Sequence, residues 1–127
     1  MKPINLVVDN VRKELRMIDW GIADFYFPDK TYSPYCGTKN YKSPEQLCRD
    51  TAYHYSTDIW SVGCIFATMM FKIKTFFRGV DDDDQIYKIM RVLGSKGLIE
   101  YALKYTLKVP VDIINVLKTE QFNGVPW

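Results

Sequence analysis

The sequence is poor in the residues that build metal centres and disulfide frameworks. It contains one histidine and three cysteines, and Cys36, Cys48 and Cys64 are scattered and have no histidine at ligand spacing. We therefore expect neither a disulfide framework nor a zinc site. Long apolar runs are also missing, because the longest, at residues 59–71, is too short to cross a bilayer. The N-terminal residues lack the layout of a secretion signal, so we expect an intracellular protein, in the cytoplasm or the nucleus, with no membrane partner.

An excess of charge of one sign is missing as well. Seventeen lysine and arginine residues stand against fifteen aspartate and glutamate residues, which gives a net charge of +2. The basic residues form no cluster, so we expect no nucleic-acid partner. With 47% hydrophobic and 25% charged residues, the composition is that of an ordinary globular chain and fits one domain or part of one.

A β-hairpin is predicted near the N-terminus. Residues 6–8 and 15–18 are β-prone and flank a polar stretch, which is the pattern of two strands joined by a turn. Antiparallel pairing brings the two outer ends of a hairpin together. Asn5 and Asp19 stand at equal distances in the sequence from Arg12. We therefore expect their side chains to lie near each other at the open end of the hairpin.

A long loop and an apolar helix are predicted next. Residues 25–40 are rich in aromatic residues and show no sustained period, which indicates an irregular loop. Loops of this length are usually functional or mobile. Residues 56–58 can cap a helix that runs to about residue 71. This helix has apolar residues on every side, so we expect it to be buried.

A run of four aspartates, residues 81–84, opens the following predicted helix. Negative charge suits the N-terminal end of a helix, where the helix dipole is positive. The run lacks the spaced ligands and the turn glycine of a calcium loop, so we expect it to cap the helix. The apolar stripe of this helix ends at Gly94, and residues 98–105 and 111–118 predict two more helices. We therefore expect a mainly α fold after residue 45.

Three short signatures follow one another in a fixed order. The first is Lys2-Pro3-Ile4-Asn5, and the second is Asp19-Trp20-Gly21, directly after a β-segment. The third is Gly-Thr-Lys-Asn-Tyr-Lys-Ser-Pro-Glu at residues 37–45, and it is followed by Asp-Ile-Trp-Ser-Val-Gly at residues 58–63. In order and spacing they resemble protein kinases, with the Lys-x-x-Asn tail of the catalytic loop, the Asp-Phe-Gly signature carrying Trp for Phe, and the Ala-Pro-Glu end of the activation segment. The resemblance implies the C-terminal lobe of a kinase, in which a short hairpin precedes the activation segment and the helices.

Phosphoryl transfer gives these residues chemical roles. Magnesium that bridges the phosphates of a nucleotide prefers hard oxygen ligands, which the Asp19 carboxylate and the Asn5 amide oxygen can supply. Lys2 would be the cation that faces the transferred phosphoryl group. Thr38 resembles the hydroxyl that ties the activation segment to the catalytic loop. The resemblance implies ATP, or GTP, and Mg²⁺ as cofactors.

Two acidic residues have structural roles in the resemblance. Asp58 would accept backbone N–H bonds from the catalytic loop at the start of the buried helix. Glu45 would be buried and paired with an arginine that lies beyond the end of this chain. Neither residue is expected to take part in the chemistry.

Long stretches of the chain closely resemble the catalytic subunit of casein kinase II. They are residues 12–32, 55–72 and 81–105, so the resemblance covers nearly all of the chain. That family phosphorylates Ser or Thr followed by acidic residues and uses basic side chains just before Pro-Glu, where Lys39 and Lys42 occupy two such positions. At a third position where the family has a basic residue, this chain has Tyr35, which is a departure from the family. The resemblance implies protein substrates with acidic sites and a regulatory subunit that binds the full-length protein.

The resemblance also implies that residues 1–127 are one part of a kinase domain, from the tail of the catalytic loop to the region after helix G. The catalytic Asp would stand immediately before Met1, and the Gly-rich loop, the β3 Lys and the closing helices would lie outside the chain. We therefore expect a partial sequence that is inactive and unstable alone. Two other hypotheses stay open: a non-catalytic binding module that uses residues 81–105, and a kinase of the cyclin-dependent or dual-specificity group, which Gly37-Thr38 would suit.

Overall fold

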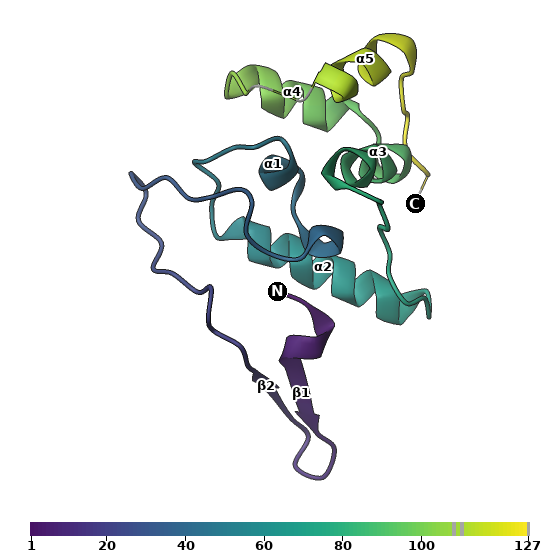
Figure 1. Ribbon diagram of the computed structural model, residues 1–127. Helices are drawn as coiled ribbons and strands as arrows, with labels where there is room; N and C mark the ends of the chain where they lie inside the picture. The colour runs from purple at the N-terminus through teal and green to yellow at the C-terminus, as the bar shows by residue number, and fades with distance from the viewer. Residues whose placement is uncertain (108, 110, 127) are drawn as a thin grey trace.

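The computed structural model describes residues 1–107, 109 and 111–126. Figure 1 shows the N-terminal hairpin projecting from one side of the molecule, helix α2 crossing its middle, and helices α3, α4 and α5 gathered on the other side. The mainly α fold predicted from the sequence is confirmed. In chain order the elements are the 3-10 turn η1 (Pro3–Asn5), strands β1 (Leu6–Asp9) and β2 (Glu14–Met17), the 3-10 turn η2 (Lys39–Tyr41), and helices α1 (Pro44–Leu47), α2 (Ser56–Met70), α3 (Asp82–Leu93), α4 (Lys96–Lys104) and α5 (Val111–Thr119).

The hairpin forms as predicted, but its pairing is shifted by one residue from the pairing that is symmetric about Arg12. Strands β1 and β2 pair antiparallel from Leu6 opposite Met17 to Asp9 opposite Glu14. The Asp9 carboxylate accepts hydrogen bonds from two N–H groups of the four-residue loop, including that of Arg12 at 3.0 Å. Such an Asx turn closes tight loops. The even-numbered loop places the centre of the hairpin between two residues, which accounts for the shift in register.

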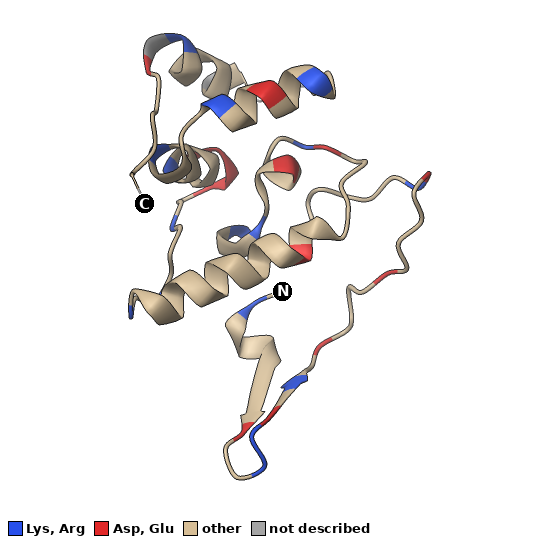
Figure 2. Cartoon of the chain, turned by 180° about the vertical axis from the view of Figure 1, so that it is seen from behind, with Lys and Arg blue, Asp and Glu red and all other residues tan. Residues whose placement is uncertain are grey.

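Helix α2 has the bounds that the sequence predicted, but its burial differs. Thr57, Ser61, Cys64 and Ile65 are buried on one face. The opposite face is exposed, and 69% of Ile59 is accessible to solvent. The expectation of burial on every side is wrong for this chain, because the described residues cover one face only. Figure 2 shows that this helix carries hardly any charge. No helix in the described part of the chain combines the length and the apolar character that a membrane crossing requires.

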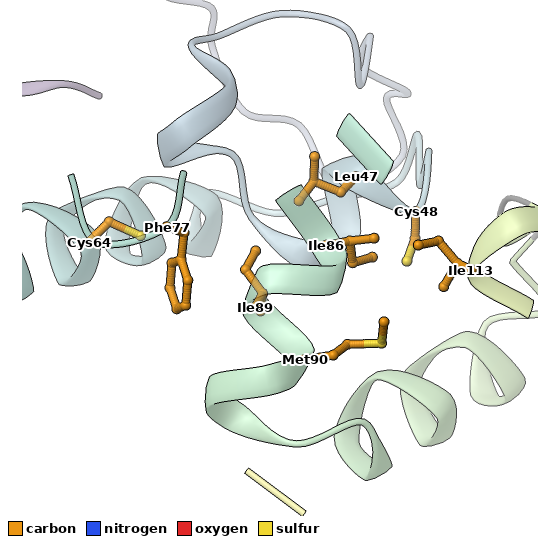
Figure 3. Close-up of a cluster of buried hydrophobic side chains, with 8 residues drawn as sticks. All are labelled: Leu47, Cys48, Cys64, Phe77, Ile86, Ile89, Met90 and Ile113. Atoms are coloured by element: carbon orange, nitrogen blue, oxygen red, sulfur yellow. The ribbon is translucent and has the colours of Figure 1, made fainter. Parts of the chain in front are cut away.

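The core surrounds helix α3. The aspartate run caps this helix as predicted, since the Asp81 side chain accepts from the N–H of Asp84 at 2.8 Å, and Gly94 ends the helix at a φ of 88°. Each fully buried apolar side chain contributes about 1.5–3 kcal/mol to stability. The buried apolar cluster, drawn in Figure 3, consists of Leu47, Cys48, Cys64, Phe77, Ile86, Ile89, Met90 and Ile113.

Two of the cysteines belong to this core. Burial raises the pKa of the Cys48 thiol to about 12 and that of the Cys64 thiol to about 11, because a thiolate loses its hydration in an apolar environment. Both thiols therefore stay protonated and unreactive at neutral pH. Their contribution is to packing.

Candidate active site

The hairpin and η1 bring Asn5 and Asp19 together. The backbone N–H of Ile18 donates to the carbonyl oxygen of Asn5 at 2.9 Å, which extends the strand pairing by one step. Beyond it, Nδ2 of Asn5 donates to Oδ2 of Asp19 at 3.1 Å. Asp19 has a φ of 63°, a left-handed conformation that costs a non-glycine residue about 1–2 kcal/mol. Such strain is concentrated at functional sites. The prediction that these two side chains meet is confirmed.

The chemistry of this pair suits Mg²⁺. Asp19 offers carboxylate oxygens and Asn5 offers an amide oxygen, and hard oxygen ligands are those that Mg²⁺ prefers. In the described part of the chain, no group of three or more His, Cys, Asp or Glu side chains could hold a metal ion. A magnesium ion at this pair would therefore complete its shell with water and with the phosphates of a nucleotide, as is usual for this ion. The residues present thus fit the metal that the kinase resemblance implies.

A cleft of about 720 Å³ lies beside this pair. Segments 17–26, 32–38 and 53–58 contribute to its walls, so residues far apart in the sequence share one cavity. Of the eight residues singled out from the sequence, six line it. They are Lys2, Asn5, Asp19, Thr38, Lys42 and Asp58.

Lys2 and Thr38 approach the cleft from different segments. Lys2 has an extended backbone and precedes η1, which begins at Pro3. Proline suits the first position of a helical turn because its φ is already fixed there. Thr38 is exposed, precedes η2, and accepts a hydrogen bond from the N–H of Tyr41 at 2.9 Å through its carbonyl oxygen. The hydroxyl of Thr38 makes no capping bond to η2, so it is not committed to that turn. The chemical roles of Lys2 and Thr38 stay predictions.

Asp58 joins the start of α2 to the start of the chain. Its Oδ1 lies 3.6 Å from the amino group of Met1, and 64% of its side chain is exposed. An acidic residue in the first turn of a helix is also stabilised by the helix dipole. Asp58 therefore lies beside the segment that carries Lys2, which is the place the resemblance gave it. Its acceptance of backbone N–H bonds stays a prediction.

The two lysines assigned to acidic substrates are already bonded within the chain. Lys42 forms an ion pair with Asp82, with 2.9 Å between Nζ and Oδ2, and its side chain is only 7% exposed. Lys39 donates from Nζ to the carbonyl oxygen of Val80 at 2.5 Å. Both contacts join the activation segment to the start of α3. A substrate carboxylate would have to compete with these acceptors, a feature that the sequence alone did not reveal.

Tyrosines hold the long loop in place, a role that the sequence did not indicate. The hydroxyl of Tyr32 donates to the carbonyl oxygen of Phe25 at 2.9 Å and accepts from the N–H of Phe27 at 2.7 Å. The hydroxyl of Tyr53 donates to the carbonyl oxygen of Ser33 at 2.8 Å. Burial raises the pKa of Tyr53, so this hydroxyl keeps its proton and remains a donor. The signal available in the sequence was the unusual number of tyrosines in and after this loop.

Glu45 lies away from the cleft. It is half-buried in the first turn of α1 and borders a second cavity of about 730 Å³, lined mainly by apolar side chains of α2 and of Phe76 and Phe77. Trp60 lines the same cavity, and its buried Nε1 has no hydrogen-bond partner among the described residues. Ser43 starts α1 with a capping box formed with Gln46. The pairing of Glu45 with an arginine outside this chain stays a prediction.

Comparisons with known proteins agree on one family. The model of the family described as "Protein kinase domain" matches residues 1–118. The chain is similar to "Casein kinase II subunit alpha'" of Saccharomyces cerevisiae, with 42% identity over 127 residues, which are 100% of this chain and 37% of the relative. It is also similar to "Probable casein kinase II subunit alpha homolog" of Encephalitozoon cuniculi, with 46% identity over 107 residues, 84% of this chain and 34% of the relative. The chain therefore spans about a third of the length of these curated relatives.

Proposed function

This chain belongs to the protein kinase domain family, and from this premise we propose that the full-length protein is an ATP-dependent serine/threonine kinase of the casein kinase II type. The observation that carries the proposal is the Asn5–Asp19 pair, joined by a 3.1 Å hydrogen bond at the edge of a cleft that Lys2 and Thr38 also line. This pair supplies the oxygen ligands, and Lys2 the cation, that phosphoryl transfer requires.

Asn5 and Asp19 would hold Mg²⁺, bound together with ATP or GTP. The metal supplies positive charge that neutralises the phosphates during transfer. The strand pairing of the hairpin fixes the separation of the two side chains, so no reorganisation is needed at the moment of reaction. Lys2 would hold the transferred phosphoryl group by charge from the wall of the same cleft. Thr38 would fix the activation segment against the catalytic-loop segment.

Substrate selection belongs to the activation segment. Lys39 and Lys42 stand just before Ser43-Pro44-Glu45, where the resemblance implies contacts to acidic side chains of a protein substrate. The relatives carry the word subunit in their names. We therefore propose a regulatory subunit as a partner of the full-length protein.

Residues 1–127 alone would not transfer phosphate. Three carboxylates line the cleft, those of Asp19, Asp24 and Asp58. Asp19 would serve the metal, Asp24 is paired with Lys30 at 2.5 Å, and Asp58 would accept backbone N–H bonds from the catalytic-loop segment. None of the three is left to act as a general base, whose contribution is typically about 10²–10⁴-fold.

The test is a phosphoryl-transfer assay on the full-length protein with a serine peptide rich in Asp and Glu. We expect Asp19→Asn to lower kcat/KM by at least about 100-fold, because the variant loses the charged metal ligand. Asp24→Asn is the matched control, since it removes a carboxylate from the same cleft without touching the Asn5–Asp19 pair, and it should retain most of the activity. Equal activity of Asp19→Asn and the wild type would refute the proposal.

A further inference from the structure

The start of α3 occupies both lysines assigned to acidic substrates. Oδ2 of Asp82 lies 2.9 Å from Nζ of Lys42, and the carbonyl oxygen of Val80 accepts from Lys39. Only 7% of the Lys42 side chain is exposed, against 42% of the Asp82 side chain. Asp82 therefore forms the more solvent-accessible part of this ion pair.

The segment that bears these acceptors is held rigidly. Gln85 is fully buried, and its Oε1 accepts from the N–H of Gly79 at 2.7 Å. The N–H of Val80 donates to Oδ2 of Asp84 at 2.9 Å. A Cβ atom on Gly79 would lie 2.4 Å from the backbone nitrogen of Gln85, so only glycine allows this close approach. The Val80 carbonyl and the Asp82 carboxylate are thus in place before any ligand binds.

A substrate carboxylate gains little binding free energy from contacting Lys42. It must displace Asp82, so one charge-assisted hydrogen bond replaces another of the same kind. Asp82 has the advantage of belonging to the same chain, which gives it a high effective concentration at the lysine. Because the Lys42 side chain is largely shielded from water, an arrangement that leaves its charge unpaired is costly.

We propose that Asp82 is a specificity-determining residue, which weakens the preference for an acidic substrate side chain by pairing with Lys42. The inference rests on the proposed function, because it concerns substrate selection by the same activation segment. Specificity depends on the difference between two binding free energies. With Asp82 in place, an acidic side chain gains less binding free energy over a neutral one at Lys42 than it would gain if the lysine were unpaired.

The experiment uses the full-length protein and two serine peptides that differ only in carrying Asp and Glu, or Asn and Gln, after the serine. The dissociation constant of each peptide is measured by fluorescence anisotropy, and kcat/KM by phosphate transfer. Asp82→Asn keeps the size and an oxygen acceptor but removes the charge. We expect the acidic-to-neutral ratio of affinities to rise about tenfold in this variant, the effect of one additional charge-assisted hydrogen bond.

Asp83→Asn is the matched control. Asp83 is the next residue of the same helical turn, and in the described part of the chain it forms no ion pair. Its substitution removes the same charge from the same region, so it should leave the ratio within about twofold of the wild type. Adding Lys42→Met to Asp82→Asn should abolish the gain, because the lysine is then missing.

The outcomes separate the two proposals. An unchanged affinity ratio in Asp82→Asn, with the circular dichroism spectrum of the wild type, would overturn the role of Asp82, as would an equal rise in Asp83→Asn. Asp82→Ser provides a second variant if Asp82→Asn does not fold. A tenfold rise in the affinity ratio without any phosphate transfer would support the role of Asp82 and contradict the proposed kinase function. Phosphate transfer to both peptides with an unchanged affinity ratio would support the kinase function and contradict the role of Asp82.

Discussion

Two single residues, one with an unusual backbone conformation and one in a close backbone contact, place polar groups for their neighbours. Asp19 adopts a left-handed φ of 63°, and this turn directs its carboxylate to the Asn5 amide. Gly79 plays a comparable part at the start of α3, where the backbone of residue 79 packs directly on that of Gln85. Asp19 thereby accepts from Asn5, and the N–H of Gly79 donates to Oε1 of Gln85.

Gly79→Ala should therefore destabilise the protein. The new Cβ would lie 2.4 Å from the backbone nitrogen of Gln85, and overpacking of this kind typically costs about 1–3 kcal/mol. Gly97→Ala is the control, because a Cβ at Gly97 meets nothing within 4 Å, and alanine in a helix should stabilise by about 0.4–1 kcal/mol. Urea unfolding of the full-length variants measures both changes. A similar shift in the two variants would contradict the close packing at Gly79.

The sequence predicted that Asn5 and Asp19 meet, but it did not predict contacts between segments that lie far apart in the chain. The proximity of Asn5 and Asp19 was predictable because both stand at the open end of one hairpin. The Lys42–Asp82 ion pair joins residues forty positions apart, and nothing in the local pattern of either segment indicates it. The sequence therefore did not indicate that Lys39 and Lys42 have partners, which the fold supplies by placing the start of α3 beside them.

Secondary-structure elements follow the local signals closely. Helix α2 has the bounds that the sequence predicted, although its N-cap is Tyr55, which makes no side-chain capping bond, and residues 56–58 lie within the helix. Helix α3 begins at its aspartates and ends at Gly94. The burial of α2 was not predictable in the same way, because an apolar surface shows that a helix can be buried and does not show what covers it. In this chain the side that contains Ile59 and Phe66 is open to solvent.

Helix α3 offers a test at this scale. Asp81→Ala removes the side chain that caps the helix at the N–H of Asp84, and the loss of an aspartate cap typically costs about 1 kcal/mol. Asp83→Ala, in the same turn, loses only its interaction with the helix dipole and should cost about 0.5 kcal/mol or less. Thermal unfolding followed by circular dichroism compares the two variants. An equal loss of stability in both would show that the cap at Asp81 contributes nothing of its own.

The whole molecule joins two functional regions through helix α2. On one side, the hairpin presents the Asn5–Asp19 pair to a cleft that reaches the first turn of α2. On the other, Ser61 of α2 donates to the carbonyl oxygen of Tyr41 at 2.8 Å, which anchors the activation segment next to the Lys42–Asp82 pair. The proposed metal site and the lysines proposed to select substrates are thus both supported by helix α2.

Binding of Mn²⁺ with a non-hydrolysable ATP analogue tests the central claim most directly. Mn²⁺ takes the oxygen ligands that Mg²⁺ takes, and its electron paramagnetic resonance signal reports the bound fraction in the full-length protein. We expect Asp19→Asn to weaken metal–nucleotide binding by about 10- to 100-fold, while Asp24→Asn binds as the wild type does. Unaltered Mn²⁺ affinity in Asp19→Asn would contradict the assignment of the hairpin's open end as the metal site of a kinase.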